Sequence, residues 1–238
     1  MESLTPEELR IVACLVEKQF TTPDSYPLTE NAVVAACNQL SNRNPVVAYD
    51  NNTVRVTLTA LRQLGLARVI HTPGARVPKH RQILDDALGL SRGEVSLLAV
   101  LALRGPQTVG ELRTRTERMH DFASPSEVEE VLEGLAARDE PLVVRLERQP
   151  GQKEARYAQL LGGPVDAAAA AAAEDRPERP ERPDSWAPAA PARPDRVAAL
   201  EQRVESLEAE LAILRAEHRE LREEFGLGAP RPAPAAEE

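Results

Sequence analysis

Aromatic residues are scarce in this chain of 238 residues: phenylalanine, tyrosine and tryptophan together make up 3 %. A hydrophobic core must therefore be built mainly from leucine, valine and alanine. The two cysteines, Cys14 and Cys37, are too few for a disulfide framework, which favours a reducing compartment. Both lie among apolar residues of predicted helices, so we expect small buried side chains rather than metal ligands or redox centres.

The sequence also lacks the segments that direct a chain into or through a membrane. The start, Met1-Glu2-Ser3, has no basic region followed by an apolar one, and no apolar run approaches a membrane span. We therefore expect a cytoplasmic protein without a membrane partner. Glycine-rich phosphate loops, nucleophile elbows and zinc-ligand spacings are missing as well. The sequence predicts no cofactor, no metal and no enzyme; catalysis would need a cleft that the sequence alone does not reveal.

Negative charge is concentrated towards the C-terminal end. The net charge is −9, and residues 164–238 hold 17 acidic but only 10 basic side chains. Residues 1–88 hold nine of each sign, and residues 89–163 hold 12 acidic and 10 basic ones. The overall acidity therefore says little about the first two thirds of the chain.

The N-terminal region begins with a dense helix-start signal. Thr5 is suited to the N-cap, Pro6 to the first helical position and Glu8 to a capping box, with Leu4 and Leu9 as the flanking hydrophobic staple. The predicted buried face of this helix holds Leu9, Val12, Leu15 and Val16. A loop over residues 21–27 and a second helix, capped by Thr29, follow.

Residues 50–81 predict a third helix, a strand and a basic loop. Asp50 can cap the helix, and an apolar stripe recurs at helical spacing along Val54, Leu58 and Leu61. Gly65 is suited to the left-handed position that ends a helix. Residues 66–71 are strand-like, and residues 72–81 form a turn-rich loop without an acidic residue. This order predicts a winged helix, in which a recognition helix lies beside a β wing.

The same order of elements returns after residue 89. Capping boxes begin helices at Ser91 and Thr108, and Ser124 begins a third helix. Residues 142–146 and 155–160 are predicted to be the two strands of a hairpin. The sequence therefore predicts two winged helices in tandem, related by element order rather than by residue identity.

Several motifs resemble those of the YceH-like family of uncharacterised bacterial proteins. They are Asn31, Ala36-Cys37-Asn38-Gln39, Ser41-Asn42-Arg43, Pro45, Arg104-Gly105-Pro106-Gln107-Thr108, Gly110-Glu111-Leu112-Arg113, Arg115, Glu117-Arg118, Pro150-Gly151-Gln152, Glu154 and Arg156-Tyr157. The resemblance covers about residues 3–162. It implies a tandem winged-helix fold and no established activity.

The expected fold class is mostly α with small β-hairpins. Winged-helix domains are predicted over residues 1–88 and 89–163, followed by an Ala/Pro-rich disordered linker over 164–194. A coiled-coil helix over 195–226 and a disordered tail over 227–238 complete the expected organisation.

A heptad pattern in the C-terminal helix predicts self-association. The predicted dimer contacts are Val197, Leu200, Val204, Leu207, Leu211, Leu214 and Leu221. Charge pairing between neighbouring helices favours a parallel homodimer over an antiparallel one. Packing of this helix onto the winged helices of its own chain is the alternative.

The function hypothesis with most support in the residues is binding of duplex DNA. The predicted contact residues are Arg43, Asn52, Arg55, Thr59, Arg62, Arg68, Arg76, Lys79 and Arg81, with His71 and His80 adding to the cationic segment. Arginine and lysine neutralise phosphates, and polar side chains on a recognition helix reach base edges. A merely polar helix and a solvated wing explain the same residues about equally well.

A protein-interaction scaffold is the second hypothesis. The third helix of the second half exposes Glu127, Glu129, Glu130 and Glu133, which would repel a phosphate backbone. The arginines of the preceding helix, Arg113, Arg115 and Arg118, are expected to pair with those carboxylates rather than with phosphate. On this hypothesis the winged helices bind another protein and no DNA.

Overall fold

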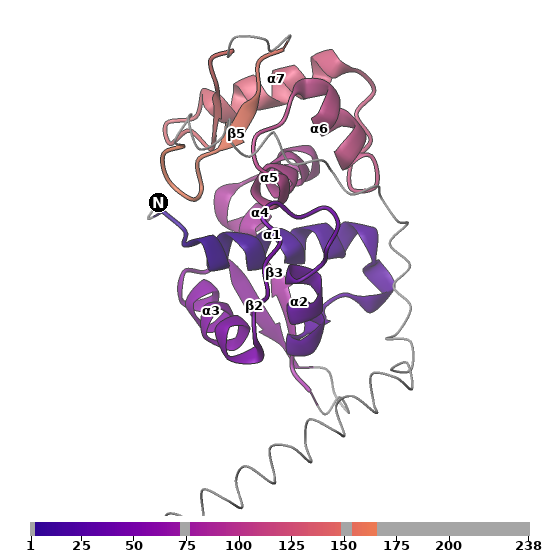
Figure 1. Cartoon of the computed structure of the whole chain (residues 1–238), viewed down its shortest axis with the longest axis vertical. Coiled ribbons are helices and arrows are strands. Elements are labelled where there is room, and N and C mark those ends of the chain that lie inside the picture. Colours follow the sequence, from indigo (N-terminus) through magenta and orange to yellow (C-terminus); the bar gives the residue numbers. More distant parts are fainter. Residues whose placement is uncertain (1–2, 72–76, 149–153, 166–238) are drawn as a thin grey trace, which may run out of the picture. The chain divides into compact units, whose positions relative to one another are not determined.

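In the computed structural model the described residues are 3–71, 77–148 and 154–165, and they belong to one compact unit (Figure 1). The helices are α1 (Pro6–Thr21), α2 (Glu30–Cys37), α3 (Asn51–Gln63), α4 (Leu84–Leu88), α5 (Arg92–Arg104), α6 (Val109–Thr116), α7 (Pro125–Ala136) and the 3-10 helix η1 (Pro23–Ser25). The strands are β1 (Leu28–Thr29), β2 (Ala67–Ile70), β3 (Lys79–Gln82), β4 (Val143–Arg145) and β5 (Tyr157–Gln159). The predicted class of helices with small antiparallel sheets is confirmed at this level.

Local signals set where many of these helices begin. The side chains of Thr5, Ser91 and Thr108 each accept a hydrogen bond from the backbone N–H of the glutamate three residues later. The carboxylate of that glutamate in turn accepts from the backbone N–H of the capping residue. All three predicted capping boxes are therefore present. Asp50 caps α3 by accepting from the Thr53 N–H at 2.7 Å. Gly65 has a φ of 72° just after α3, as its sequence position predicted.

The N-terminal half comprises the elements from α1 to α4, and the C-terminal half those from α5 to β5. In the N-terminal half, α1 packs against α2, α3 and a three-stranded antiparallel sheet. The strand order is β1-β3-β2, so β3 lies in the middle. Val69 and Leu28 both pair with His80, from opposite sides of that strand. Strand side chains alternate between the two faces of a sheet. His80 and Gln82 are buried on one face, and Lys79 and Arg81 lie on the other.

The C-terminal half repeats three helices and a hairpin. Helix α5 packs against α6, α7 and β5, and β4 pairs with β5. Gln107, just before α6, forms an isolated bridge with Tyr157 of β5. Arg156 donates to Glu111 Oε2 at 2.7 Å, which ties the second hairpin to α6.

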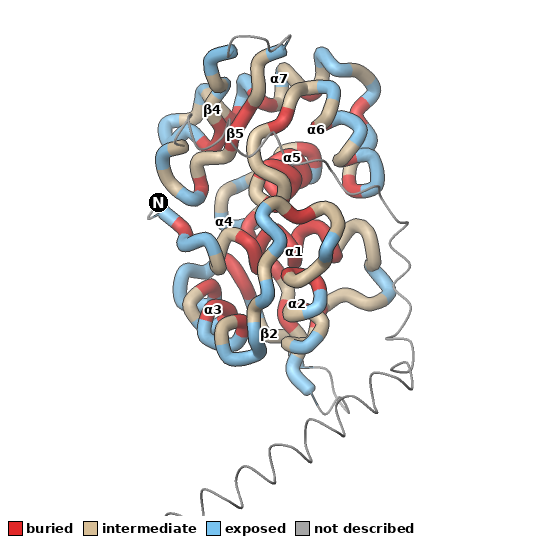
Figure 2. Tube along the Cα trace, in the orientation of Figure 1, coloured by how far each residue is buried: buried red, intermediate tan, exposed pale blue. Residues whose placement is uncertain are grey.

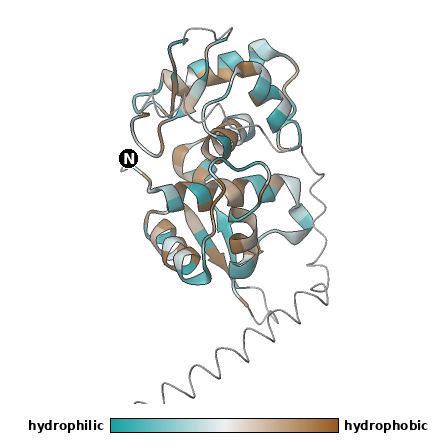
Figure 3. Cartoon of the chain, viewed as in Figure 1, coloured by the Kyte–Doolittle hydropathy of each residue, from teal (hydrophilic) through white to brown (hydrophobic). Residues whose placement is uncertain are grey.

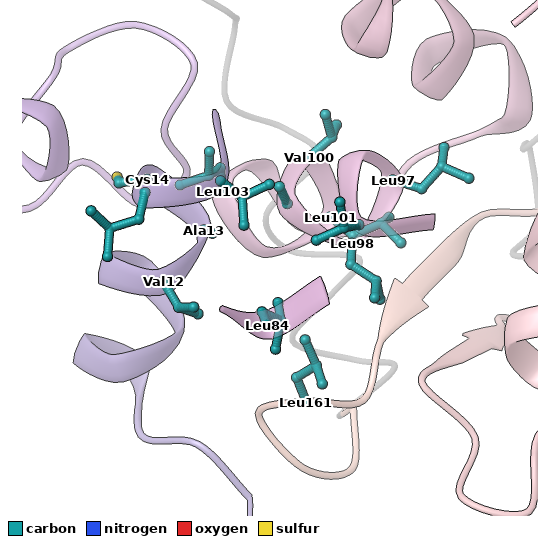
Figure 4. Close-up of a cluster of buried hydrophobic side chains, with 14 of the residues drawn as sticks. Val12, Ala13, Cys14, Leu84, Leu97, Leu98, Val100, Leu101, Leu103 and Leu161 are labelled. Atoms are coloured by element: carbon teal, nitrogen blue, oxygen red, sulfur yellow. The ribbon is translucent and has the colours of Figure 1, made fainter. Parts of the chain in front are cut away.

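The two halves share one hydrophobic core, centred on the contact between α1 and α5 (Figure 2). Both helices are buried along most of their length, and hydrophobic residues follow α5 through the middle of the unit (Figure 3). Figure 4 shows Val12 and Cys14 of α1 in the same cluster as Leu98 and Leu101 of α5. The chain also returns from the second hairpin to the first helix, where the Leu4 N–H donates to the Leu161 carbonyl at 2.8 Å.

The structure corrects several sequence-based expectations. Residues 79–82, at the end of the predicted basic loop, form the central strand β3. The loop expected before Thr29 contains η1 and is followed by β1, and α4 was not predicted at all. Burial of α1 extends from Arg10 to Lys18 rather than along one face, because α5 covers the side turned away from its own sheet. The predicted boundary between residues 88 and 89 remains a prediction.

Other expectations concern side chains or lie outside the described residues. Cys14 and Cys37 are free and buried, as predicted. The linker, the coiled-coil helix and the tail predicted beyond residue 165 lie outside the described residues, as do the seven residues predicted to form the dimer contacts.

Candidate nucleic-acid interface

The outer face of α3 carries four of the predicted contact residues. Asn52, Arg55, Thr59 and Arg62 are all exposed, while Val54, Thr57, Leu58 and Leu61 are buried against the rest of the half. Arg55 Nη2 donates to Asn52 Oδ1 at 2.7 Å, so neighbouring turns of the helix orient this guanidinium group. Because these four residues are exposed, the second half leaves this face open, while the opposite side of α3 packs mainly against α1, α2 and β2.

The hairpin beside α3 adds three further cations. Arg68 on β2 is exposed, and Lys79 and Arg81 on β3 are half-buried. Arg68 and Arg81 lie directly opposite each other in the antiparallel register. Like charges at such a position repel each other across the strands. A sheet that retains two facing arginines is suited to a partner that supplies negative charge.

Two hollows separate α3 from the hairpin. The larger, about 560 Å³, is lined by Arg62, Gln63, Gly65 and Arg68 among others. The smaller, about 250 Å³, is lined by Glu30, Arg55, Leu58, Pro78 and His80 among others. Four residues line both hollows: Thr59, Arg62, Val69 and His71. Arg62 is therefore the one arginine that lines both hollows, while neither hollow is lined by Lys79 or Arg81.

The cations of this surface are not neutralised by neighbouring carboxylates. In the stretches 3–71, 77–148 and 154–165, the ion pairs involve other residues, and none includes Arg55, Arg62, Arg68, Lys79 or Arg81. Within these stretches, Glu30, at the first turn of α2, is the one carboxylate that lines either of the two hollows described above. The surface therefore keeps an excess of positive charge although the whole N-terminal half is neutral by sequence.

Arg43 requires a correction, because it does not lie on this surface. It is only 6 % exposed, and it donates to both carboxylate oxygens of Glu17, at 3.0 and 2.6 Å. Its Nε also donates to the Ala36 carbonyl. A guanidinium group held in this way is not available to a phosphate, and the prediction that Arg43 binds DNA is wrong. Arg76 lies outside the described residues.

His80 of the hairpin also differs from the sequence-based expectation. His80 is buried, and its burial lowers its pKa; Glu30 acts to raise the pKa and Arg62 to lower it further. His80 is therefore uncharged near neutral pH rather than part of a cationic segment. Its neighbour Glu30 was not predicted, because the sequence shows only a helix start there and the pairing of β1 with β3 brings it close.

The second half has a different surface. Of the four glutamates predicted to be exposed on α7, Glu130 and Glu133 are exposed, whereas Glu127 and Glu129 are half-buried. Arg115 of α6 was expected to pair with these glutamates. Its Nη1 lies 3.6 Å from Oε1 of Glu111, one turn earlier in its own helix. The predicted acidity of α7 is therefore present on the folded surface, opposite in sign to α3.

The described residues contain no group of three or more His, Cys, Asp or Glu side chains arranged to hold a metal ion. No helix in that part of the chain is both long and apolar enough to cross a membrane.

Comparison with known proteins assigns the family. Residues 4–152 match the family described as protein of unknown function DUF480. A UPF0502 protein of Pelobacter propionicus is 47 % identical over 212 residues, which cover 89 % of this chain and 93 % of the relative. UPF0502 proteins of Geobacter sulfurreducens and Koribacter versatilis are 50 % and 52 % identical, over 70 % and 68 % of this chain and 75 % of each relative. The chain belongs to this bacterial family, and the family assignment made from its motifs is confirmed.

Proposed function

We propose that the chain is a non-enzymatic DNA-binding protein of two winged helices, resembling a transcription regulator. Support for the winged helices comes from the element order. Each half runs through three helices into an antiparallel hairpin, and in the first half a short strand, β1, precedes α2 and completes a three-stranded sheet. In such folds the third helix enters the major groove and the hairpin contacts the neighbouring backbone.

The observation that carries the proposal is the set of unpaired arginines around Arg62. Arg55, Arg62 and Arg68 lie on adjacent elements, α3 and β2, and line hollows between them. Arginines without a carboxylate partner gain most from phosphate, which also releases the counterions that surround duplex DNA. Asn52 and Thr59 on the same helix face supply groups that can hydrogen-bond to base edges.

The N-terminal half is assigned the DNA contact, because the acidic face of α7 would repel phosphate.

Because each chain supplies few cations, a single copy is expected to bind DNA weakly. The heptad positions of residues 195–226 supply the proposed homodimer, which would double the contact. Replacing Leu207 and Leu211 together with Asn should convert a dimer to a monomer in sedimentation experiments. Unchanged dimer mass would overturn that part of the proposal.

A gel-shift titration of the full chain against duplex DNA tests the proposal. Binding is expected at low salt for the wild type and for Arg148→Gln, which removes an exposed charge from the second half. The triple substitution Arg55→Gln, Arg62→Gln, Arg68→Gln should weaken this binding strongly. All three side chains are exposed, so the variant is expected to fold. Equal binding by the triple variant, or none by the wild type, would overturn DNA binding.

A protein-interaction scaffold is the second candidate. The acidic face of α7 favours it, as does Val56, which is 60 % exposed on the outer face of α3 and offers an apolar contact. Crosslinking followed by mass identification of partners, with and without nuclease, separates the two candidates. Crosslinks from α3 to one protein that persist after nuclease digestion would support the scaffold and count against DNA.

A further inference from the structure

A buried polar atom without a partner belongs to His80, one of the residues that line the smaller hollow between α3 and the hairpin. His80 is 8 % exposed, and its Nδ1 has no hydrogen-bond partner among the described residues. A buried polar group without a partner costs free energy, and most such groups in proteins bond to a neighbour, to water or to a ligand. Residue His80 lines the hollow, so a bound molecule that displaces the side chains covering Nδ1 can supply the missing partner.

The other lining residues define the chemistry of such a molecule. Arg55 and Arg62 supply two guanidinium groups at the same hollow, and Thr59 supplies a hydroxyl. Guanidinium groups match carboxylates and phosphates, whose oxygens accept two parallel hydrogen bonds. Neutral imidazole can add a further donor through its Nδ1–H. Together these groups favour an oxyanion.

The rest of the lining favours an apolar body on that oxyanion. Leu58, Val69 and Pro78 contribute hydrocarbon surface to the hollow. Its volume of about 250 Å³ is slightly below the range of roughly 300–1,000 Å³ for pockets that hold drug-sized ligands. The hollow therefore has room for a small organic molecule and more than enough for inorganic phosphate.

We propose that the hollow bounded by Arg55, Arg62 and His80 is a binding site for a small organic oxyanion, a carboxylate or a phosphate monoester. The anionic group contacts the two arginines and His80, and the apolar body lies against Leu58 and Val69. Glu30 limits the total negative charge that the site accepts. A singly or doubly charged head group with a hydrocarbon body is therefore preferred to a polyanion.

This site goes beyond DNA binding and does not depend on it, because it is a property of the free protein. If the proposed function also holds, the ligand and the DNA backbone compete for Arg62. The small molecule would then be an effector that weakens DNA binding.

Titration of the full chain with phenyl phosphate, benzoate and inorganic phosphate, followed by calorimetry and by the imidazole signals of His80 in NMR spectra, tests the site. We expect phenyl phosphate or benzoate to saturate, with a dissociation constant at least about tenfold lower than that of inorganic phosphate because of the apolar contact. Whichever of the two binds more tightly identifies the head group. Glu30→Gln should tighten binding about threefold by removing a nearby negative charge.

Matched variants locate the binding. Arg62→Gln, on an exposed position that cannot disturb the core, and His80→Leu, which keeps a buried side chain of similar size, should each weaken binding at least about tenfold. Arg148→Gln removes an exposed charge of the second half that does not line the hollow, and should leave binding unchanged. Absence of saturation by both organic anions, or wild-type affinity in Arg62→Gln and His80→Leu, would overturn the site. DNA binding would remain a separate result.

Discussion

Arg43 and Glu17 form a two-point ion pair inside the protein, with Nη1 and Nη2 of the arginine donating to the two carboxylate oxygens at 3.0 and 2.6 Å. The arginine also donates to the Gln39 side chain and to the carbonyls of Ala36 and Asn42. These bonds tie the connection between α2 and α3 to the central helix α1. The position of α3, and hence of the candidate DNA surface, depends on this pair.

Removing one partner of this pair should destabilise the protein strongly. Arg43→Met leaves the Glu17 carboxylate buried without its guanidinium, and such changes cost about 3–5 kcal/mol in the free energy of unfolding. The double variant Glu17→Leu, Arg43→Met removes both charges of the pair but leaves the buried Lys18 without its contact to Glu17, which spans 3.4 Å, so it should recover only part of that loss. Urea unfolding measures both. A cost below about 1 kcal/mol for Arg43→Met would contradict the structural role of the pair.

The same pair predicts a pH dependence of stability. Burial raises the pKa of Glu17, but the charge and hydrogen bonds of Arg43, with a contribution from Lys18, outweigh it and hold the pKa below its ordinary value of 4.5. The folded state therefore binds this proton less readily than the unfolded chain. Glu17 therefore stabilises the fold fully when the pH is above the ordinary pKa of a glutamate. This stabilisation is lost as the pH falls through the lowered pKa of Glu17 in the folded state.

Comparison of the wild type with Glu17→Gln isolates this contribution. The difference in unfolding free energy between the two proteins should be constant at neutral pH and should shrink as the pH falls below about 4.5. Urea unfolding at a series of pH values supplies the measurement. A difference that stays constant down to the acid transition would be incompatible with a lowered pKa for Glu17.

Asn42 is expected to be sensitive to substitution for two separable reasons. Its φ of 60° lies in the left-handed region, and its side-chain oxygen accepts a hydrogen bond from Arg104 at the end of α5. Asn42→Gly can still adopt the left-handed backbone conformation and loses only the hydrogen bond with Arg104. Asn42→Ala loses that hydrogen bond as well and adopts the left-handed conformation only at a cost. In thermal unfolding, the free energy of unfolding of Asn42→Ala should be about 1 kcal/mol lower than that of Asn42→Gly. Equal stability of the two variants would mean that the backbone conformation carries no cost.

The shared core predicts that the two halves unfold together. Leu98 of α5 is fully buried in the cluster that includes Val12 of α1. Leu98→Ala should cost about 2–5 kcal/mol. Amide exchange should then accelerate in α3 as well as in α7, because both helices depend on this core. Faster exchange confined to the second half would support two independently stable domains instead.

Much of the fold could be predicted because its signals are local. The capping boxes at Thr5, Ser91 and Thr108 involve residues three positions apart, and such patterns can be recognised in sequence. The two-residue strand β1 could not be found in this way, since Leu28 is a strand residue only through its pairing with His80 across the fold. The continuous burial of α1 from Arg10 to Lys18 likewise results from contact with α5, which no local pattern encodes.

The candidate site was predictable only in part for the same reason. Arg55 and Arg62 follow from the helical period opposite the apolar stripe of α3. An arginine on a surface and an arginine in a buried ion pair look alike in sequence, so Arg43 was assigned wrongly. The unpartnered Nδ1 of His80 and the neighbouring Glu30 carry no sequence signal, because burial and proximity arise only when β1 and β3 pair.

The salt dependence of DNA affinity tests the central claim most directly. For the wild type and for Arg148→Gln, fluorescence anisotropy between about 50 and 200 mM salt should give parallel, steep declines of log affinity against log salt. The variant Arg55→Gln, Arg62→Gln, Arg68→Gln should bind more weakly, with a slope shallower by about 2 to 3. If its slope and affinity equal those of the wild type, these arginines do not contact phosphate, and the account of this surface is wrong.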